Sequence, residues 1–166
     1  MNYIKITKND IANGPGVRCA LWVAGCNCHC KGCHNPSTWS FSAGKPFNMN
    51  SLNELFNALN KPYIQGLTLT GGNPLDNAPE ILAISRRFKE RFPNKDLWLY
   101  SGYTYEEIIQ SEVFRCILEY VDVLVDGPYI EEQKDITLKF RGSRNQRLID
   151  VKETLKHNKI VTIQND

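Results

Sequence analysis

The stretch "RCALWVAGCNCHCKGCHNPSTW", from Arg18 to Trp39, joins a strand-like segment directly to a cluster of four cysteines. Its first part, "RCALWVAG", is a short apolar run that is typical of a buried strand in a parallel sheet. The cysteines that follow are therefore expected in a loop at the carboxyl end of that strand. In parallel α/β folds, binding and catalytic sites are built at this edge of the sheet.

The same pattern of short apolar runs and helical periodicity continues along the rest of the chain. Four more strands are predicted, in "GLTLTGG" (66–72), "LWLYSGY" (97–103), "VDVLVDGPY" (121–129) and "KIVTI" (159–163), with "YIKI" (3–6) as an edge strand. Helices are predicted in "SLNELFNALN" with Ser51 as N-cap, in "NAPEILAISRRFKERF" with Asn77 as N-cap, and in "TYEEIIQSEVFRCILEY" with Thr104 as N-cap. This alternation favours a mostly parallel sheet with helical crossovers.

Composition bounds the class of protein. A length of 166 residues, with 42% hydrophobic and 23% charged residues, suits one globular domain over residues 1–166. The net charge of +2 gives no indication of nucleic-acid or membrane binding. The opening "MNYIKITKND" has no apolar run, so we expect neither a signal peptide nor a membrane anchor, and a cytoplasmic location. In a reducing compartment, clustered cysteines favour a metal or catalytic role over disulfides.

The cysteine spacing favours an iron–sulfur cluster over zinc without excluding zinc. Cys26, Cys30 and Cys33 form a CxxxCxxC pattern, and Cys28 falls inside its first gap. Structural zinc sites commonly use two separated cysteine pairs, and the second pair is missing, although nearby histidines are available as ligands. Three cysteines would hold three irons of a 4Fe–4S cluster and leave the fourth iron open to a small molecule.

The turn "TGGNPL", from Thr70 to Leu75, ends the next strand with two adjacent glycines. A plain tight turn explains such a pair. Glycine also permits a close approach of the backbone to a ligand. Since this turn is expected at the same sheet edge as the cysteine loop, an open iron site beside a glycine-lined groove is the alternative explanation.

Taken together, the CxxxCxxC loop and the following GG-x-P turn resemble the radical S-adenosylmethionine superfamily. The resemblance narrows to the family of activating proteins of the anaerobic ribonucleoside-triphosphate reductase, and it runs in order over nearly the whole chain. It rests on "NGPGVR" (13–18), "GCHNPSTW" (32–39), "TGGNPL" (70–75), "SGYTYEE" (101–107), "VDVLVDGPY" (121–129) and "FRGSRNQRLIDV" (140–151).

The resemblance implies a set of site residues. Cys26, Cys30 and Cys33 would ligate a 4Fe–4S cluster, whose fourth iron would be chelated by the amino and carboxylate groups of S-adenosylmethionine. No catalytic side chain is implied. Six positions would contact S-adenosylmethionine: Gly32, His34, Gly71, Gly72, Asn73 and Asp126. For Asp126 a plain strand-end turn is the competing explanation. Many members of the superfamily carry an acidic residue at the position of Asn73, whose amide oxygen can still accept a hydrogen bond.

The resemblance also implies a reaction and partners. One electron from a low-potential donor, such as reduced flavodoxin, would cleave S-adenosylmethionine, and the resulting 5′-deoxyadenosyl radical would take hydrogen from a glycine of the partner reductase. The fold expected from it is a partial, open (β/α) barrel of about five mostly parallel strands, because a full barrel needs about 250 residues.

Several alternatives remain open on the sequence alone. The chain could activate another glycyl-radical enzyme of the formate-lyase type, act on a free metabolite, or be a zinc-stabilised binding module without turnover. Cys28 is interpreted as a bystander near the cluster, whereas Cys19 and Cys116 are interpreted as small core residues. The basic segment with Arg141, Arg144 and Arg147 is either a solvated loop or a contact for cofactor or partner.

Overall fold

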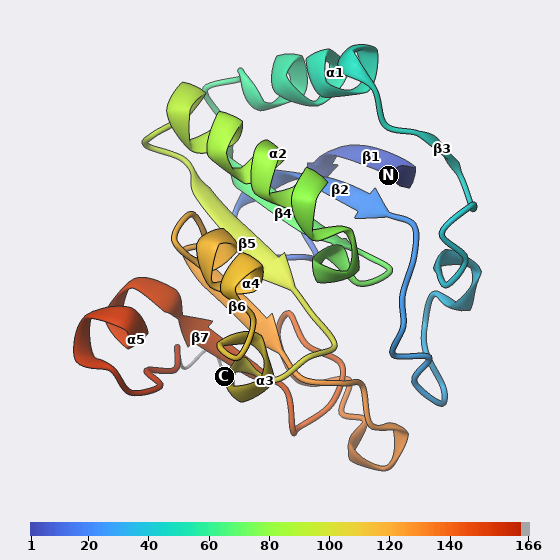
Figure 1. The fold of residues 1–166 in the computed structure, drawn as a ribbon, viewed down its shortest axis with the longest axis vertical. Helices are drawn as coiled ribbons and strands as arrows, with labels where there is room; N and C mark the ends of the chain where they lie inside the picture. Colours follow the sequence, from blue (N-terminus) through green and yellow to red (C-terminus); the bar gives the residue numbers. More distant parts are fainter. Residues whose placement is uncertain (164–166) are drawn as a thin grey trace.

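The computed structural model describes residues 1–163 and shows an α/β fold around a single mixed sheet (Figure 1). Within these residues the sheet has seven strands in the order β3-β1-β2-β4-β5-β6-β7, and it is not closed into a barrel. The strands are β1 (Asn2–Asp10), β2 (Val17–Val23), β3 (Lys45–Pro46), β4 (Ile64–Gly71), β5 (Asp96–Tyr100), β6 (Val123–Asp126) and β7 (Arg147–Asp150).

Four neighbouring strands, β2, β4, β5 and β6, run parallel, so their carboxyl ends share one edge of the sheet. β1 and β7 flank them in the antiparallel direction. The prediction of about five mostly parallel strands is therefore wrong in number and in part of the direction. The segment 159–163 makes only an isolated bridge between Thr162 and Ile149, and the strand beside β6 is β7 instead.

The helices lie mainly on one face of the sheet. The α-helices are α1 (Met49–Leu59), α2 (Ala78–Arg91), α3 (Tyr105–Ile108), α4 (Glu112–Leu118) and α5 (Val151–His157). Figure 1 shows α1, α2 and α4 covering the same face, while α5 lies beside β7. In the described chain no helix is long and apolar enough to cross a membrane.

Successive strand residues point to opposite faces, and this alternation separates the core from the site. Leu21, Leu69 and Leu99 are aligned across the parallel strands and are fully buried in the core beneath the helices. Their neighbours Trp22 and Thr70 pair in register and face a cavity on the opposite side of the sheet. The helix-covered face therefore supplies stability, and the other face supplies the site.

The helix starts differ in two respects from the prediction. α1 begins three residues earlier than expected, with Asn48 as N-cap and Ser51 at the third helical position. The two residues bond reciprocally, Ser51 N donating to Asn48 Oδ1 at 3.1 Å and Asn48 N donating to Ser51 Oγ at 3.2 Å. Thr104 caps α3 as predicted. Asn77 stands at the N-cap of α2, but its side chain instead donates to the carbonyl of Ala24 at 2.9 Å.

Candidate metal centre

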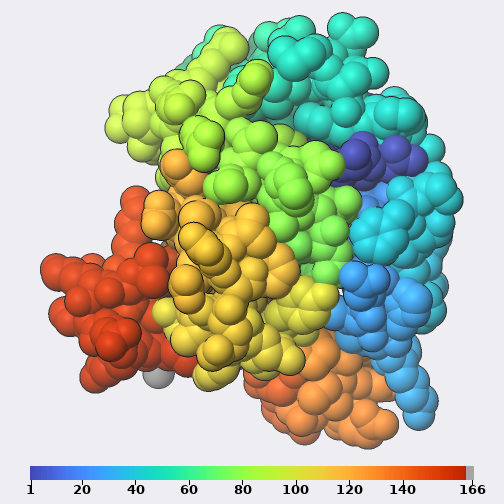
Figure 2. Space-filling model, in the orientation of Figure 1, coloured from blue at the N-terminus to red at the C-terminus, as the bar shows by residue number. Residues whose placement is uncertain are grey.

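A cavity of about 560 Å³ lies on the face of the sheet opposite α1, α2 and α4. The loop after β2, the turn after β4, the loop after β5 and the segment from Gly127 to Gln146 all contribute to its lining. In the space-filling view of Figure 2 the loop after β2 lies beside the segment near residue 130. All four cysteines of the loop line this cavity: Cys26, Cys28, Cys30 and Cys33.

The cysteine loop is fixed at its base by backbone hydrogen bonds. Gly25 N donates to the carbonyl of Thr38 at 2.7 Å, and Cys26 N donates to the carbonyl of Trp39 at 3.1 Å. The ring of His29 stacks on the ring of Trp39, with centroids 4.4 Å apart and an interplanar angle of 12°. The two ends of the loop are therefore joined to each other directly after β2.

The glycine turn after β4 packs directly against the start of the cysteine loop. Gly72 N donates to the carbonyl of Val23, and Asn73 N donates to the carbonyl of Gly25, both at 2.8 Å. A Cβ atom on Gly72 would lie 2.3 Å from the carbonyl oxygen of Gly25, and Gly71 has a φ of +105°. The two glycines are thus required for the contact between the two loops. Gly71 and Gly72 also line the cavity, as does Asn73.

The Asn73 side chain is held in one orientation inside the cavity wall. It is 1% exposed. Its Oδ1 accepts a hydrogen bond from Ser101 Oγ at 3.1 Å, and its Nδ2 donates to the sulfur of Cys28 at 3.7 Å. The amide therefore links the turn after β4 to the loop after β5 and to the cysteine loop.

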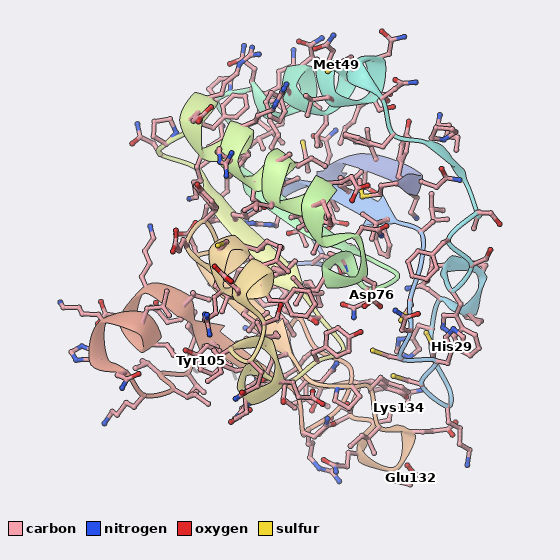
Figure 3. All side chains as sticks on the ribbon, in the orientation of Figure 1. His29, Met49, Asp76, Tyr105, Glu132 and Lys134 are labelled. Carbon is pink, nitrogen blue, oxygen red and sulfur yellow. The ribbon has the colours of Figure 1, made fainter. Side chains whose placement is uncertain are left out.

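Asp76 joins the same three loops from the other side. Its Oδ2 accepts from the backbone N of Asn27 at 2.8 Å, and its Oδ1 accepts from the hydroxyl of Tyr103 at 2.5 Å. Figure 3 shows Asp76 and the loop bearing His29 on either side of a group of sulfur atoms. A carboxylate from the turn after β4 thus holds the residue between Cys26 and Cys28.

The thiols differ in acidity because Cys26 and Cys28 hydrogen bond to each other and because burial differs in its net effect on each thiol. A hydrogen bond from the Cys28 thiol, with further bonds from the backbone N–H groups of Cys28 and His29, lowers the pKa of Cys26 to about 6, although burial opposes the shift. The same pairing, followed by burial, raises the pKa of Cys28. Burial raises the pKa of Cys30. Thiolate is the form of cysteine that binds metals, and the lowered pKa of Cys26 favours this form.

The remaining residues predicted to contact the cofactor are His34, Gly32 and Asp126, and each lies in a different environment. His34 lines the cavity and packs against Tyr129, with ring centroids 5.0 Å apart. Gly32 is exposed and faces Glu131. Asp126 is fully buried and accepts from the backbone N of Tyr105 at 2.7 Å. Neither Gly32 nor Asp126 lines the cavity, and their contact with a cofactor stays a prediction.

The three arginines of the basic segment lie in three different environments. Arg147 pairs with Asp126 at 2.5 Å and with Glu106 at 2.7 Å, and these bonds raise the pKa of the guanidinium. Arg141 lines the cavity, and Arg144 is exposed. Arg147 therefore has a structural role in ion pairs, and Arg141 is the arginine of this segment that lies beside the site.

Sequence reasoning missed the residues that connect the loops. Ser101 and Asp76 orient Asn73 and the cysteine loop, and Tyr100 donates from its hydroxyl to the carbonyl of Phe140 at 2.6 Å. Ser101 lies within the segment predicted as a strand (97–103) and directly follows β5 in the structure, so its place near the carboxyl end of that segment was the available signal. Asp76 carried no comparable signal because it follows the glycine turn as an ordinary polar residue.

The donor set fits an iron–sulfur cluster. Four free thiols within eight residues line one cavity, and thiolates are the ligands that hold such clusters. Within residues 1–163, no three His, Cys, Asp or Glu side chains are placed to hold a single metal ion. Cys26, Cys30 and Cys33 would hold the cluster, and the turn at Gly71–Asn73 would face a second ligand across the cavity.

Comparison with known proteins agrees with this donor set. A family model described as "4Fe-4S single cluster domain" matches residues 12–149, a span that contains every cavity-lining residue. The fold and the site thus define an α/β protein of the iron–sulfur class.

Curated relatives narrow the class further. The chain is 49% identical to an anaerobic ribonucleoside-triphosphate reductase-activating protein of Enterobacteria phage T4, over 89% of this chain and 93% of the relative. Proteins of the same name from Pasteurella multocida (strain Pm70) and Escherichia coli (strain K12) are 44% and 41% identical, each over 88% of this chain and over 95% and 96% of their own lengths. The chain belongs to the family of anaerobic ribonucleoside-triphosphate reductase-activating proteins.

Proposed function

We propose that this protein activates an anaerobic ribonucleoside-triphosphate reductase by reductive cleavage of S-adenosylmethionine at a 4Fe–4S cluster. The observation that carries the proposal is the convergence of Cys26, Cys30 and Cys33 with the Gly71–Asn73 turn on one cavity. The names of the relatives support the reductase as target, and the matched family model supports the cluster over the zinc alternative.

When bound, the cluster and S-adenosylmethionine would supply the redox chemistry, a reductive cleavage that would provide the 5′-deoxyadenosyl radical for hydrogen abstraction from a glycine of the reductase. The chain's own residues bind and orient. The three thiolates hold the cluster, and Asn73 Oδ1, which already accepts from Ser101, has a second lone pair for the cofactor's amino group. Radical abstraction needs no protein acid or base.

The walls of the cavity serve a second task, which is to limit side reactions. Trp22 and Phe140 contribute apolar surface, and the hydroxyl bond from Tyr100 to Phe140 ties the segment 127–146 across the site. The open sheet leaves a way in for a loop of a large partner. In this proposal a low-potential donor such as reduced flavodoxin supplies the electron, and the fold is the partial, open form of the radical S-adenosylmethionine barrel.

The decisive experiment mixes the anaerobically reconstituted protein with the reductase, S-adenosylmethionine and a reductant, and records electron paramagnetic resonance spectra. We expect a glycyl radical on the reductase with the native protein and with Cys116→Ala, whose cysteine lies in α4 away from the cavity. We expect none with Cys30→Ala. A zinc-loaded, air-stable protein that yields no radical would overturn the proposal.

A further inference from the structure

Cys28 is a fourth thiol in the cavity, and the proposed function gives it no role. Its sulfur accepts a hydrogen bond from Asn73 Nδ2 at 3.7 Å. A Cβ atom on Gly102 would lie 2.6 Å from the same sulfur. The sulfur therefore occupies a niche between the turn after β4 and the loop after β5, and this niche has room for it only because residue 102 is glycine.

The other cysteines outside the pattern are placed quite differently. Cys19 is fully buried in β2, and burial raises the pKa of its thiol to about 11. Cys116 is half-buried in α4. Neither lines the cavity, whereas Cys28 lines it together with Cys26, Cys30 and Cys33. Ligation by four thiolates is the ordinary arrangement of a 4Fe–4S cluster, and the loop carries four.

Cys28 also lies beside the place proposed for the cofactor. Asn73 Oδ1 is the atom proposed to receive the amino group of S-adenosylmethionine, and Nδ2 of the same amide donates to the sulfur of Cys28. A thiolate and the cofactor would therefore approach the fourth iron from the same wall of the cavity. If both use that iron, the cofactor must displace the thiolate when it binds.

We propose that Cys28 is an exchangeable fourth thiolate ligand of the cluster, bound before S-adenosylmethionine arrives and displaced by it. The inference rests on the proposed function. In the exchange the bond from iron to the Cys28 sulfur breaks, and bonds form to the cofactor's amino nitrogen and carboxylate oxygen. The cofactor's ammonium group loses a proton when its nitrogen binds iron, the released thiolate takes up a proton, and no electron is transferred. Before the cofactor binds, the Cys28 thiolate would thereby shield the fourth iron of the cluster.

The exchange predicts opposite effects on cofactor affinity and on cluster survival. If nine-tenths of the cluster is capped, the apparent affinity for S-adenosylmethionine is reduced about tenfold, because only the uncapped fraction binds. Cys28→Ala should therefore bind the cofactor about tenfold more tightly than the native protein. Without cofactor, the same variant should lose iron to a ferrous chelator several-fold faster, because its fourth iron is permanently open.

The test compares native protein, Cys28→Ala and Cys116→Ala, each reconstituted anaerobically and assayed by cofactor titration and by chelator-driven iron release. Cys116→Ala should match the native protein in both assays. With saturating S-adenosylmethionine, Cys28→Ala should release iron at the native rate. Unchanged affinity and unchanged release in Cys28→Ala would overturn the proposal, as would failure of Cys28→Ala to assemble a cluster. If no form binds S-adenosylmethionine, the proposed function fails, while the release rates without cofactor still decide whether Cys28 is a ligand.

Discussion

Removing the Asp76 carboxylate should loosen the cysteine loop at one identifiable hydrogen bond. Asp76 Oδ2 accepts from Asn27 N at 2.8 Å, and Tyr103 holds the other carboxylate oxygen. Hydrogen bonds to charged groups contribute about 1.5–3 kcal/mol, and this one is exposed, so we take the lower value of about 1.5 kcal/mol. That loss corresponds to an exchange rate at the Asn27 amide about tenfold faster in Asp76→Ala.

The assay is amide hydrogen exchange by nuclear magnetic resonance on the cluster-free protein. Tyr103→Phe is the matched control, because it removes the bond that orients the carboxylate but leaves the acceptor for Asn27 in place, and it should accelerate the Asn27 amide less than threefold. Asp76→Asn, which keeps one acceptor oxygen, should fall between the two. An Asn27 amide that exchanges at the native rate in Asp76→Ala would refute the view that this carboxylate holds the loop.

Three further predictions concern the turn after β4 and the acid stability of the fold. Gly72→Val should reduce iron content as well as cofactor binding, because its side chain meets the carbonyl of Gly25; full iron loading would contradict the contact. Asn73→Ala should keep its iron and weaken S-adenosylmethionine binding about fivefold in an anaerobic titration, since one hydrogen bond of about 1 kcal/mol is lost; native affinity would remove Asn73 from the site. Burial opposes ionisation of Asp122, but hydrogen bonds from Lys152 and Lys89 outweigh this effect and lower the pKa of the carboxyl below 3.8. The ionised Asp122 stabilises the fold above the pKa of this group in the unfolded chain, and this stabilisation is lost as the pH falls through its lower pKa in the folded protein. The free energy of unfolding of Asp122→Asn, measured by urea titration, should therefore fall less between about pH 4 and pH 2 than that of the native protein. An equal fall in both proteins would contradict this.

The outcome expected for Gly72→Val shows what spacing alone cannot reveal. In the sequence the glycine turn and the thiolates belong to two separate loops, more than thirty residues apart. The structure places Gly72 against Gly25, the residue before the first cysteine, so the two loops are one unit. The sequence indicated that both loops lie at the same edge of the sheet, but not that their backbones are in direct contact.

Prediction of the fold succeeded where burial makes a clear pattern. β2, β4, β5 and β6 are central strands, so they read as continuous apolar runs. β7 has only four residues, of which two are fully apolar, and β3 has two residues, so neither produces a detectable period. The segment 159–163 has the composition of a strand, but tertiary context leaves it with one bridge to Ile149.

The hydrogen bonds from Gly72 to Val23 and from Asn73 to Gly25 continue the pairing of β2 with β4 beyond the ends of both strands. They have a consequence for what holds the cysteine loop. The pairing of these two strands positions the base of the loop by backbone contacts that involve no metal. In zinc fingers, by contrast, metal binding supplies the free energy of folding. In this chain the backbone bonds of the sheet already fix the starting point of the cysteine loop, so the position of that point does not depend on a metal ligand.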